Sequence, residues 1–577
     1  MKSVVGQIMR GTRKRFLILA IAGITTSMVV NGFLFWHSDT SGPFVRMRDG
    51  FKLYTRVYLP AGWTEANGSL PVIMLRTPYI IDSAGSVAMA KAQAASGYAV
   101  VLQDIRGRGG SAGTGSFPIF PSEQDDAYDT TSWIVSQWWC NGHIATIGAS
   151  AEAYTQLACH AAGSPGVEAA MIHSGASELY DQWIYPGGCL RKNFMESWLP
   201  SVKGMSYYPT VIDNARKDAY WMQRSLTMGN QYAQVNVRAV HFGGWYDCFQ
   251  AGTIESFMLY NHDATAHARD HQVLVMGPWI HGSMNHSGVP EYASLDGGYT
   301  LAYQARDFLF NEALLGIPWN WTAQPRVYYM LMGDPADPAA NTYHTAMDWP
   351  VPSTSEQWYF HPNGSLSITV PSPGNHSYLY DPRDPVHTGG GRAFPVQAST
   401  ITDVPITYGA FDVRATETGR PDILKFTSGN LTSPVEIVGH LRATLNIASN
   451  CTDTDFTVKL IDIFPDGREI YVADGILKAR YRGGFSSADA RTMEPGQVYD
   501  LDVDMWSMAY RFSPNHRIRV SITSSNYPEY AVNPNTGAAV GPWGPGDMGT
   551  IPFSIANNTL LLGQGSTPSC IWFPRTA

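Results

Sequence analysis

The sequence predicts a chain of two parts, an α/β domain with a mostly parallel sheet followed by an all-β sandwich. From about residue 42 to 316, short apolar runs alternate with helical patterns, which is typical of a parallel sheet covered by helices on both faces. After about residue 325, apolar and polar residues alternate with a period of two, as in half-buried antiparallel strands. The 577 residues, 44% of them hydrophobic, supply ample core material, which excludes a mainly disordered chain.

Charge and composition exclude further classes of protein. The net charge is −9 and the only basic cluster lies at the extreme N-terminus, so we expect no nucleic-acid partner. The six cysteines contain no CxxC pair, so a structural zinc site is not expected. We predict no metal site among the 16 histidines and no cofactor. The cysteine count allows one or two disulfides, and the oligomeric state stays open.

Residues 1–38 are predicted to be an N-terminal signal anchor. An apolar run of 20 residues extends from Phe16 to Phe35, long enough to cross a bilayer as a helix. The run follows five basic residues, Lys2, Arg10, Arg13, Lys14 and Arg15. This positive flank should stay cytoplasmic, and the absence of a clear A-x-A site favours an uncleaved anchor over a cleaved signal peptide. We expect a membrane-anchored or secreted protein with its enzyme domain on the extracytoplasmic or lumenal side.

Eight N-x-S/T sequons agree weakly with that location and predict a glycoprotein. They begin at Asn67, Asn285, Asn320, Asn363, Asn375, Asn430, Asn450 and Asn557. Chance alone would supply several of them, so an unglycosylated bacterial export protein is the alternative.

Residues 43–325 are predicted to form the α/β domain. Its expected strands are Leu70–Leu75, Tyr98–Gln103, Ile144–Gly148, Val237–Phe242 and Val273–Gly277, with helices over Glu123–Trp138 and Tyr154–Ala162. The stretch 177–233 is rich in Trp, Tyr and Met and contains no clear strand. We expect this stretch to be an inserted helical cap.

Three polar residues at the ends of these strands predict a serine nucleophile with its acid and base. Ser150 lies in Gly148-Ala149-Ser150 between a strand and a helix, and a sharp turn of this kind lifts a hydroxyl clear of the sheet. Asp247 and His281 each follow a later strand. The base takes the hydroxyl proton, while the acid orients the base. The chain order Ser, Asp, His is that of α/β hydrolases.

Two further groups are candidates for an oxyanion hole. Tyr79 ends the segment Arg76-Thr77-Pro78-Tyr79 at a strand end, where its phenol could face a developing oxyanion. Ala151 follows the nucleophile and offers its backbone N–H. The alternative is that Tyr79 only packs against other side chains.

Residues 340–577 are predicted to form a jelly-roll-like β sandwich. Apolar residues occupy every second position in three segments, Leu441–Ile447, Phe456–Leu460 and Ile518–Ile522. Strands with this pattern, separated by turn residues, are typical of two sheets that pack face to face.

These motifs together resemble the cocaine esterase/NonD hydrolase family, which is related to X-prolyl dipeptidyl aminopeptidases. The resemblance covers about residues 43–540 and implies that Tyr79 completes the oxyanion hole. At the elbow, Ala151 and Ala153 replace the family's usual Tyr and Gly. The matching segments are Arg76–Tyr79, Asp104–Gly113, Trp139–Gly142, Gly244–Asp247, Gly277–His281, Asp453–Phe456, Asp462–Gly467, Ser524–Pro528 and Asn533–Gly537.

The resemblance implies a serine hydrolase that cleaves an ester or amide through an acyl-enzyme. Relatives that bind a substrate ammonium carry extra carboxylates after the catalytic Asp, but here Cys248, Phe249 and Gln250 follow Asp247. A neutral acyl ester is therefore favoured, with a small-molecule substrate. X-prolyl dipeptidyl-peptidase activity on short peptides and a catalytically silent surface-binding module are the alternatives. Candidates for an aromatic acyl pocket are Trp183, Tyr185, Trp198 and Trp245.

Overall fold

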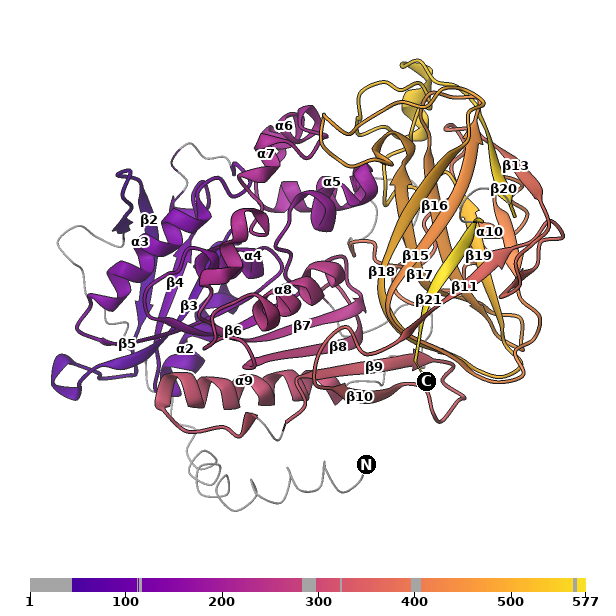
Figure 1. Cartoon of the computed structure of the whole chain (residues 1–577). Coiled ribbons are helices and arrows are strands. Elements are labelled where there is room, and N and C mark those ends of the chain that lie inside the picture. Colours follow the sequence, from indigo (N-terminus) through magenta and orange to yellow (C-terminus); the bar gives the residue numbers. More distant parts are fainter. Residues whose placement is uncertain are drawn as a thin grey trace.

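The computed structural model describes residues 44–111, 113, 117–282, 297–321, 324–395, 406–563 and 568–576. It consists of two lobes that lie side by side, an α/β lobe and an all-β lobe (Figure 1). The predicted fold class, an α/β hydrolase followed by a β sandwich, is confirmed.

One sheet organises the α/β lobe. Its strand order is β1-β2-β4-β3-β5-β6-β7-β8-β9-β10, and the strands from β4 to β9 in this order are parallel. The strands are β1 (Phe44–Arg46), β2 (Lys52–Tyr58), β3 (Leu70–Thr77), β4 (Ala99–Asp104), β5 (Cys140–Ala149), β6 (Val167–His173), β7 (Arg238–Tyr246), β8 (Gln272–Ile280), β9 (Val327–Gly333) and β10 (Thr342–Ala346). Because β5, β7 and β8 are parallel neighbours or near neighbours, their C-terminal ends meet at one edge of the sheet.

Helices cover both faces of this sheet (Figure 1). Strand β3 shows the reason, because all its residues are buried while alternate side chains face opposite sides. Ile73 and Leu75 pack on the face covered by α2 and α9, whereas Val72 and Met74 pack on the face of α3, α4 and α8. The helices are α2 (Ala84–Ala95), α3 (Glu123–Val135), α4 (Ala151–Ala161), α8 (Gln250–His262) and α9 (Gly297–Leu315).

The segment between β6 and β7 forms the cap. In place of strands it has short helices and helical turns, namely Tyr180–Ile184, Pro186–Gly188, α5 (Lys192–Ser201), Met205–Tyr207, α6 (Tyr208–Asp213), α7 (Ala219–Met222) and Met228–Gln234. The insertion expected over 177–233 thus falls between two neighbouring strands of the sheet. The cap lies beside the C-terminal ends of β5 and β7.

The all-β lobe is a sandwich of two antiparallel sheets. The larger sheet holds β11 (Thr354–Phe360), β12 (Leu366–Ser367), β13 (Gly374–Tyr380), β15 (Val435–Ser449), β18 (Tyr499–Phe512), β20 (Ala556–Leu562) and β21 (Cys570–Arg575). The smaller has the order β14-β19-β16-β17, with β14 (Leu424–Thr427), β19 (Arg517–Thr523), β16 (Asp455–Ile463) and β17 (Glu469–Lys478). A short helix, α10 (Arg414–Glu417), precedes β14.

The boundary between the lobes differs from the sequence expectation. Strand β9 begins after residue 325 and β10 falls inside the range 340–577 that was assigned to the sandwich, yet both belong to the α/β sheet. β10 pairs with β9 from Thr342 opposite Leu331 to Ala346 opposite Val327. The apolar run of β9 looks like a sandwich strand in sequence, but it adds to the buried edge of β8.

One hydrophobic core joins the two lobes. It contains residues of β7, α8 and β8 from the α/β lobe together with both sheets of the sandwich, including Trp245, Phe257, Leu441 and Val520. The sandwich is therefore packed against the strands that end just before Asp247 and His281.

The structure tests the disulfide expectation but not the predicted N-terminal anchor. Across the described part of the chain, no helix is long and apolar enough to span a bilayer, while the predicted anchor at residues 1–38 lies outside the described residues. All six cysteines are described, and all are free thiols. The disulfides that the cysteine count allowed are therefore not formed in this structure.

Candidate active site

Ser150 occupies a sharp turn between β5 and α4. Its φ of 61° and ψ of −123° are backbone angles that non-glycine residues rarely adopt. Gly148, two residues earlier, is required because a Cβ there would lie 2.5 Å from the Glu152 Cβ. Gly175 packs closely against the start of α4, because a Cβ built there would lie 3.3 Å from the Ala153 Cβ. The turn places the serine hydroxyl at the edge of the sheet.

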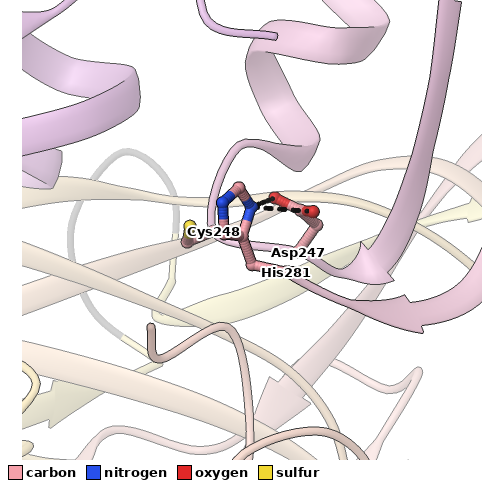
Figure 2. Close-up of side chains that lie close together, drawn as sticks. All are labelled: Asp247, Cys248 and His281. Carbon is pink, nitrogen blue, oxygen red and sulfur yellow. Dashed lines mark hydrogen bonds and ion pairs between the residues drawn. The ribbon is translucent and has the colours of Figure 1, made fainter. Parts of the chain in front are cut away.

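His281 and Asp247 complete a hydrogen-bonded chain with Ser150. The His281 Nε2 is 3.0 Å from the Ser150 Oγ, and the Nδ1 is 3.0 and 3.1 Å from the two Asp247 oxygens. Figure 2 shows the carboxylate against this edge of the imidazole ring. The structure thus brings together the three residues that the sequence singled out, in the arrangement of a nucleophile, a base and an orienting acid.

The environment keeps Asp247 ionised. Burial opposes its charge, but the charge and hydrogen bond of His281, with donors from Ser174 and the Phe249 N–H, lower the pKa of Asp247. The same pairing has the opposite effect on the pKa of the base, His281. Burial alone would lower the pKa of His281, but Cys248 and Asp247 reverse this effect and raise that pKa well above its ordinary value. The site therefore favours an imidazolium, the form that appears once the base has taken a proton.

Ser174 is a site residue that the sequence analysis did not find. Its hydroxyl donates to the Asp247 Oδ2 at 2.6 Å, opposite the oxygen that accepts from the Phe249 N–H at 2.7 Å. Ser174 has a φ of 52° and follows β6, so no spacing relative to Asp247 could reveal it. Four donor contacts fix the carboxylate from several sides.

Tyr79 follows β3 and points its hydroxyl toward the nucleophile. The Trp198 Nε1–H donates to the Tyr79 oxygen at 3.0 Å, and Ser150 lies within hydrogen-bonding reach of the same hydroxyl. Although 36% of the residue is exposed, desolvation of the phenol end raises the pKa of Tyr79 to about 12. The hydroxyl hence stays protonated at neutral pH, with its own proton free to donate. Ala151 is the first residue of α4, where helical N–H groups lack an intrahelical acceptor.

Glu152 connects these two parts of the site. Its carboxylate accepts from the Thr77 hydroxyl at 2.7 Å and from the Ala149 N–H at 3.3 Å. Thr77 in turn accepts from the Tyr79 N–H at 3.0 Å. This glutamate in the first turn of α4 therefore fixes the serine turn relative to the Tyr79 segment.

Aromatic rings surround the chain of Ser150, His281 and Asp247. The rings of Phe249 and Phe394 lie 5.0 and 5.3 Å from that of His281. Trp183 lies 4.7 Å from Phe249 and 5.2 Å from Trp198. Two of the four predicted pocket residues, Trp183 and Trp198, are thus beside the site. Phe394, which comes from the segment after β13, was not predicted.

Tyr185 and Trp245 lie elsewhere. The Tyr185 hydroxyl donates to the Val211 carbonyl inside the cap. The Trp245 indole donates to the Met330 carbonyl at 2.8 Å and belongs to the core between the lobes. Because these contacts lie inside the cap and between the lobes, we assign both side chains to packing in place of the substrate-binding role suggested by their residue type.

The sandwich braces the segment that carries Asp247. Arg191 of the cap donates to the Cys248 carbonyl at 3.0 Å and pairs with Glu529 of the sandwich at 3.8 Å. Gln250 donates to the Ser507 carbonyl of β18. The sandwich thus contacts Gln250 directly and Cys248 through Arg191, although it supplies none of the three residues in the hydrogen-bonded chain.

Fold and site together define an α/β hydrolase with a helical cap and a C-terminal β sandwich. Two family models match the chain: X-Pro dipeptidyl-peptidase (S15 family) over residues 49–208 and 201–283, and the X-Pro dipeptidyl-peptidase C-terminal non-catalytic domain over 320–541. The chain belongs to this CocE/NonD and X-Pro dipeptidyl-peptidase-like family of serine hydrolases, as its motifs predicted. It is an ester or amide hydrolase, and the silent binding module is not supported.

Similar proteins agree over most of the chain. Cocaine esterase of Rhodococcus sp. (strain MB1 Bresler) is 29% identical over 570 residues, covering 87% of this chain and 94% of that protein. An aminopeptidase from a marine sediment Thaumarchaeota archaeon has a TM-score of 0.74 at 22% identity, covering 96% and 99% of the two chains. A CocE/NonD family hydrolase from Staphylococcus aureus has a TM-score of 0.69 at 17% identity, covering 92% and 93%. These two structures support the fold alone.

Proposed function

We propose that the protein hydrolyses neutral acyl esters through an acyl-enzyme on Ser150. His281 takes the hydroxyl proton as Ser150 attacks the ester carbonyl, and Asp247 stabilises the resulting imidazolium. Tyr79 and the Ala151 N–H donate to the oxyanion of the tetrahedral intermediate. His281 then protonates the leaving alcohol, and water releases the acid by the reverse steps. The observation that carries this proposal is the continuous chain from Ser150 through His281 to Asp247.

The preference for a neutral acyl group rests on the residues that follow Asp247. Phe249 packs its ring against His281, and Gln250 is turned away to the sandwich. Neither position offers a carboxylate for a substrate ammonium. Trp183 and Trp198 extend the aromatic surface beside Tyr79, which suits an apolar or aromatic acyl group.

A panel of purified substrates tests the proposal. The wild-type protein should hydrolyse p-nitrophenyl esters faster than aminoacyl-prolyl anilides and β-lactam side-chain amides, and a fluorophosphonate should label Ser150. If Ser150→Ala kept the esterase rate, the nucleophile assignment would be wrong.

The second candidate function is X-prolyl dipeptidyl-peptidase activity on short peptides. It is favoured by the match of residues 49–283 to the X-Pro dipeptidyl-peptidase model. The same panel decides between the two. Efficient cleavage of aminoacyl-prolyl anilides with weak esterase activity would replace the ester proposal by the peptidase.

We also propose that residues 16–35 anchor the enzyme with its lobes outside the cytoplasm. The proposal rests on the 20-residue apolar run and the five basic residues before it. Seven of the eight sequon asparagines are described, and all seven are exposed, which suits a glycoprotein. Alkaline carbonate extraction should leave the full chain in the membrane pellet. A soluble mature chain beginning beyond Phe35 would reject the anchor, and a soluble cytosolic chain with Met1 intact would reject the topology.

A further inference from the structure

Besides Ser150 and Asp247, the His281 side chain has a third polar neighbour, the thiol of Cys248. Ligand atoms of Asp247, Cys248 and His281 all lie within 4.8 Å of one another. Figure 2 shows the imidazole ring between the Asp247 carboxylate and the Cys248 sulfur. The sequence analysis brought Asp247 and His281 together but assigned no role to Cys248, the residue that follows Asp247. A thiol, an imidazole and a carboxylate in one place form a donor set that binds transition metals.

The contacts decide which of these atoms could bind an ion. Both Asp247 oxygens already accept hydrogen bonds, from His281, Ser174 and Phe249. The His281 Nδ1 is engaged by this carboxylate, while Nε2 faces the Ser150 hydroxyl at 3.0 Å. The remaining donors are the Nε2 and the Cys248 thiol. An acid that holds the far nitrogen of a metal-binding histidine is a common outer-sphere arrangement at zinc sites.

The geometry and the donor types favour zinc. Zn–S and Zn–N bonds of about 2.3 and 2.0–2.1 Å at a tetrahedral angle place the two ligand atoms roughly 3.5 Å apart. One ring nitrogen of His281 lies within 4.8 Å of the Cys248 sulfur, and Figure 2 shows this sulfur on the side of the ring away from the Asp247 carboxylate, so a modest side-chain shift, on the order of 1 Å, would bring Sγ and Nε2 to the spacing that zinc needs. Thiolate with imidazole suits Zn²⁺ or Cd²⁺, whereas Mg²⁺ and Ca²⁺ prefer oxygen ligands.

We propose that Cys248 and His281 form an inhibitory zinc site inside the active site. On binding, the Cys248 S–H bond breaks, its proton passes to solvent, and the sulfur lone pair forms the S–Zn bond. The Nε2 lone pair forms the second bond, and water or the Ser150 hydroxyl fills the remaining positions. His281 then has no lone pair to accept the serine proton. The inhibitory role rests on the proposed function, whereas metal binding by the pair does not.

Cadmium titration of the full chain measures binding independently of catalysis. Cd²⁺ should produce the ultraviolet charge-transfer absorption of a Cd–thiolate bond in the wild-type protein. Cys248→Ser should lose this band, and His281→Ala should weaken Cd²⁺ binding by ~10-fold or more, since even outer-sphere changes cost about 10–100-fold. Cys140→Ser, a change at the least buried cysteine, is the matched control and should keep the band. Fluorophosphonate labelling of Ser150 in Cys248→Ser confirms that the site is folded.

Zinc inhibition of ester hydrolysis gives the second readout. Half-inhibition of Cys248→Ser should need ~10-fold or more Zn²⁺ than half-inhibition of the wild type, and a chelator should restore wild-type activity. No band in the wild type, or an equal band in Cys248→Ser, overturns the site. A lost band with unchanged zinc sensitivity overturns the inhibitory role. Failure of the proposed function appears separately, as a protein without esterase activity that still gives the cadmium band.

Discussion

Replacing Ser174 by alanine removes one donor from the Asp247 carboxylate and leaves the three reacting residues in place. The bond is short, 2.6 Å from the Ser174 Oγ to the Oδ2, and both residues are only 1% exposed. Water therefore cannot readily replace the lost donor. A hydrogen bond to a charged group is worth about 1.5–3 kcal/mol, so Ser174→Ala should lower the free energy of unfolding by about that amount at neutral pH.

Part of the free energy of the Ser174–Asp247 hydrogen bond should also stabilise the transition state of the reaction. If half of it holds the carboxylate against the imidazolium, the barrier rises by about 0.75–1.5 kcal/mol, and kcat falls roughly 4- to 13-fold, because 1.36 kcal/mol corresponds to tenfold in rate. KM should change little, since Ser174 acts through Asp247. Ser256→Ala is the matched control, because the Ser256 hydroxyl donates to the neutral Gly252 carbonyl at 2.7 Å. That change should cost only about 0.5–1.5 kcal/mol of stability and leave kcat unchanged.

The pH dependence provides an independent check. The pKa of Asp247 is lowered in the folded protein, in part by Ser174. A lowered carboxylate pKa stabilises the fold above the unfolded value of about 3.9, and this stabilisation is lost as pH falls through the folded pKa. The stability difference between wild type and Ser174→Ala should thus be full at neutral pH and shrink in acid. Chemical denaturation at several pH values measures it. Wild-type stability together with wild-type kcat in Ser174→Ala would refute the reasoning.

Four further outcomes follow from the site. Ser150→Ala should lower kcat by about 10⁴–10⁶ and abolish fluorophosphonate labelling, which gel fluorescence measures. Tyr79→Phe keeps the ring and should lower kcat by about 10²–10³ with the fold intact by circular dichroism; an unchanged kcat would return Tyr79 to packing. Because the base must be neutral and the pKa of His281 is raised, kcat/KM should rise with pH well above the usual histidine range; a plateau beginning near pH 6.5 would contradict this direction. Trp245→Phe should lower stability by about 1–3 kcal/mol by leaving the Met330 carbonyl unpaired and leave KM unchanged; a raised KM would restore a substrate-binding role.

The sequence predicted the parts of the site that are local in the chain. The short segments around Ser150, Asp247 and His281 each combine a strand with the turn that follows, so the sequence indicates both the strand and its functional residue. The fold class follows from the same strands, because alternation with helices predicts a parallel sheet.

The residues that escaped prediction act across long separations. Ser174 reaches Asp247 over 73 positions, and Phe394 reaches His281 from beyond β13. Residue type also misled, since Trp183 and Trp245 are equally aromatic and equally buried. Only the fold distinguishes the tryptophan beside the site from the tryptophan between the lobes. The predicted domain boundary was misplaced because β9 and β10 have the sequence pattern of sandwich strands, although they lie at the edge of the α/β sheet.

The contacts that brace Asp247 bear on the order in which a growing chain becomes active. Gln250 bonds a residue 257 positions later, and Arg191 pairs with Glu529, so both braces are among the last parts to be synthesised. Contacts of such long sequence separation form late in folding, because closing the intervening chain costs entropy before the contact forms. All of the α/β sheet is made before the sandwich, yet the acid acquires its final surroundings only after the sandwich has formed. We therefore expect a growing chain to gain full activity only when its C-terminal strands are complete.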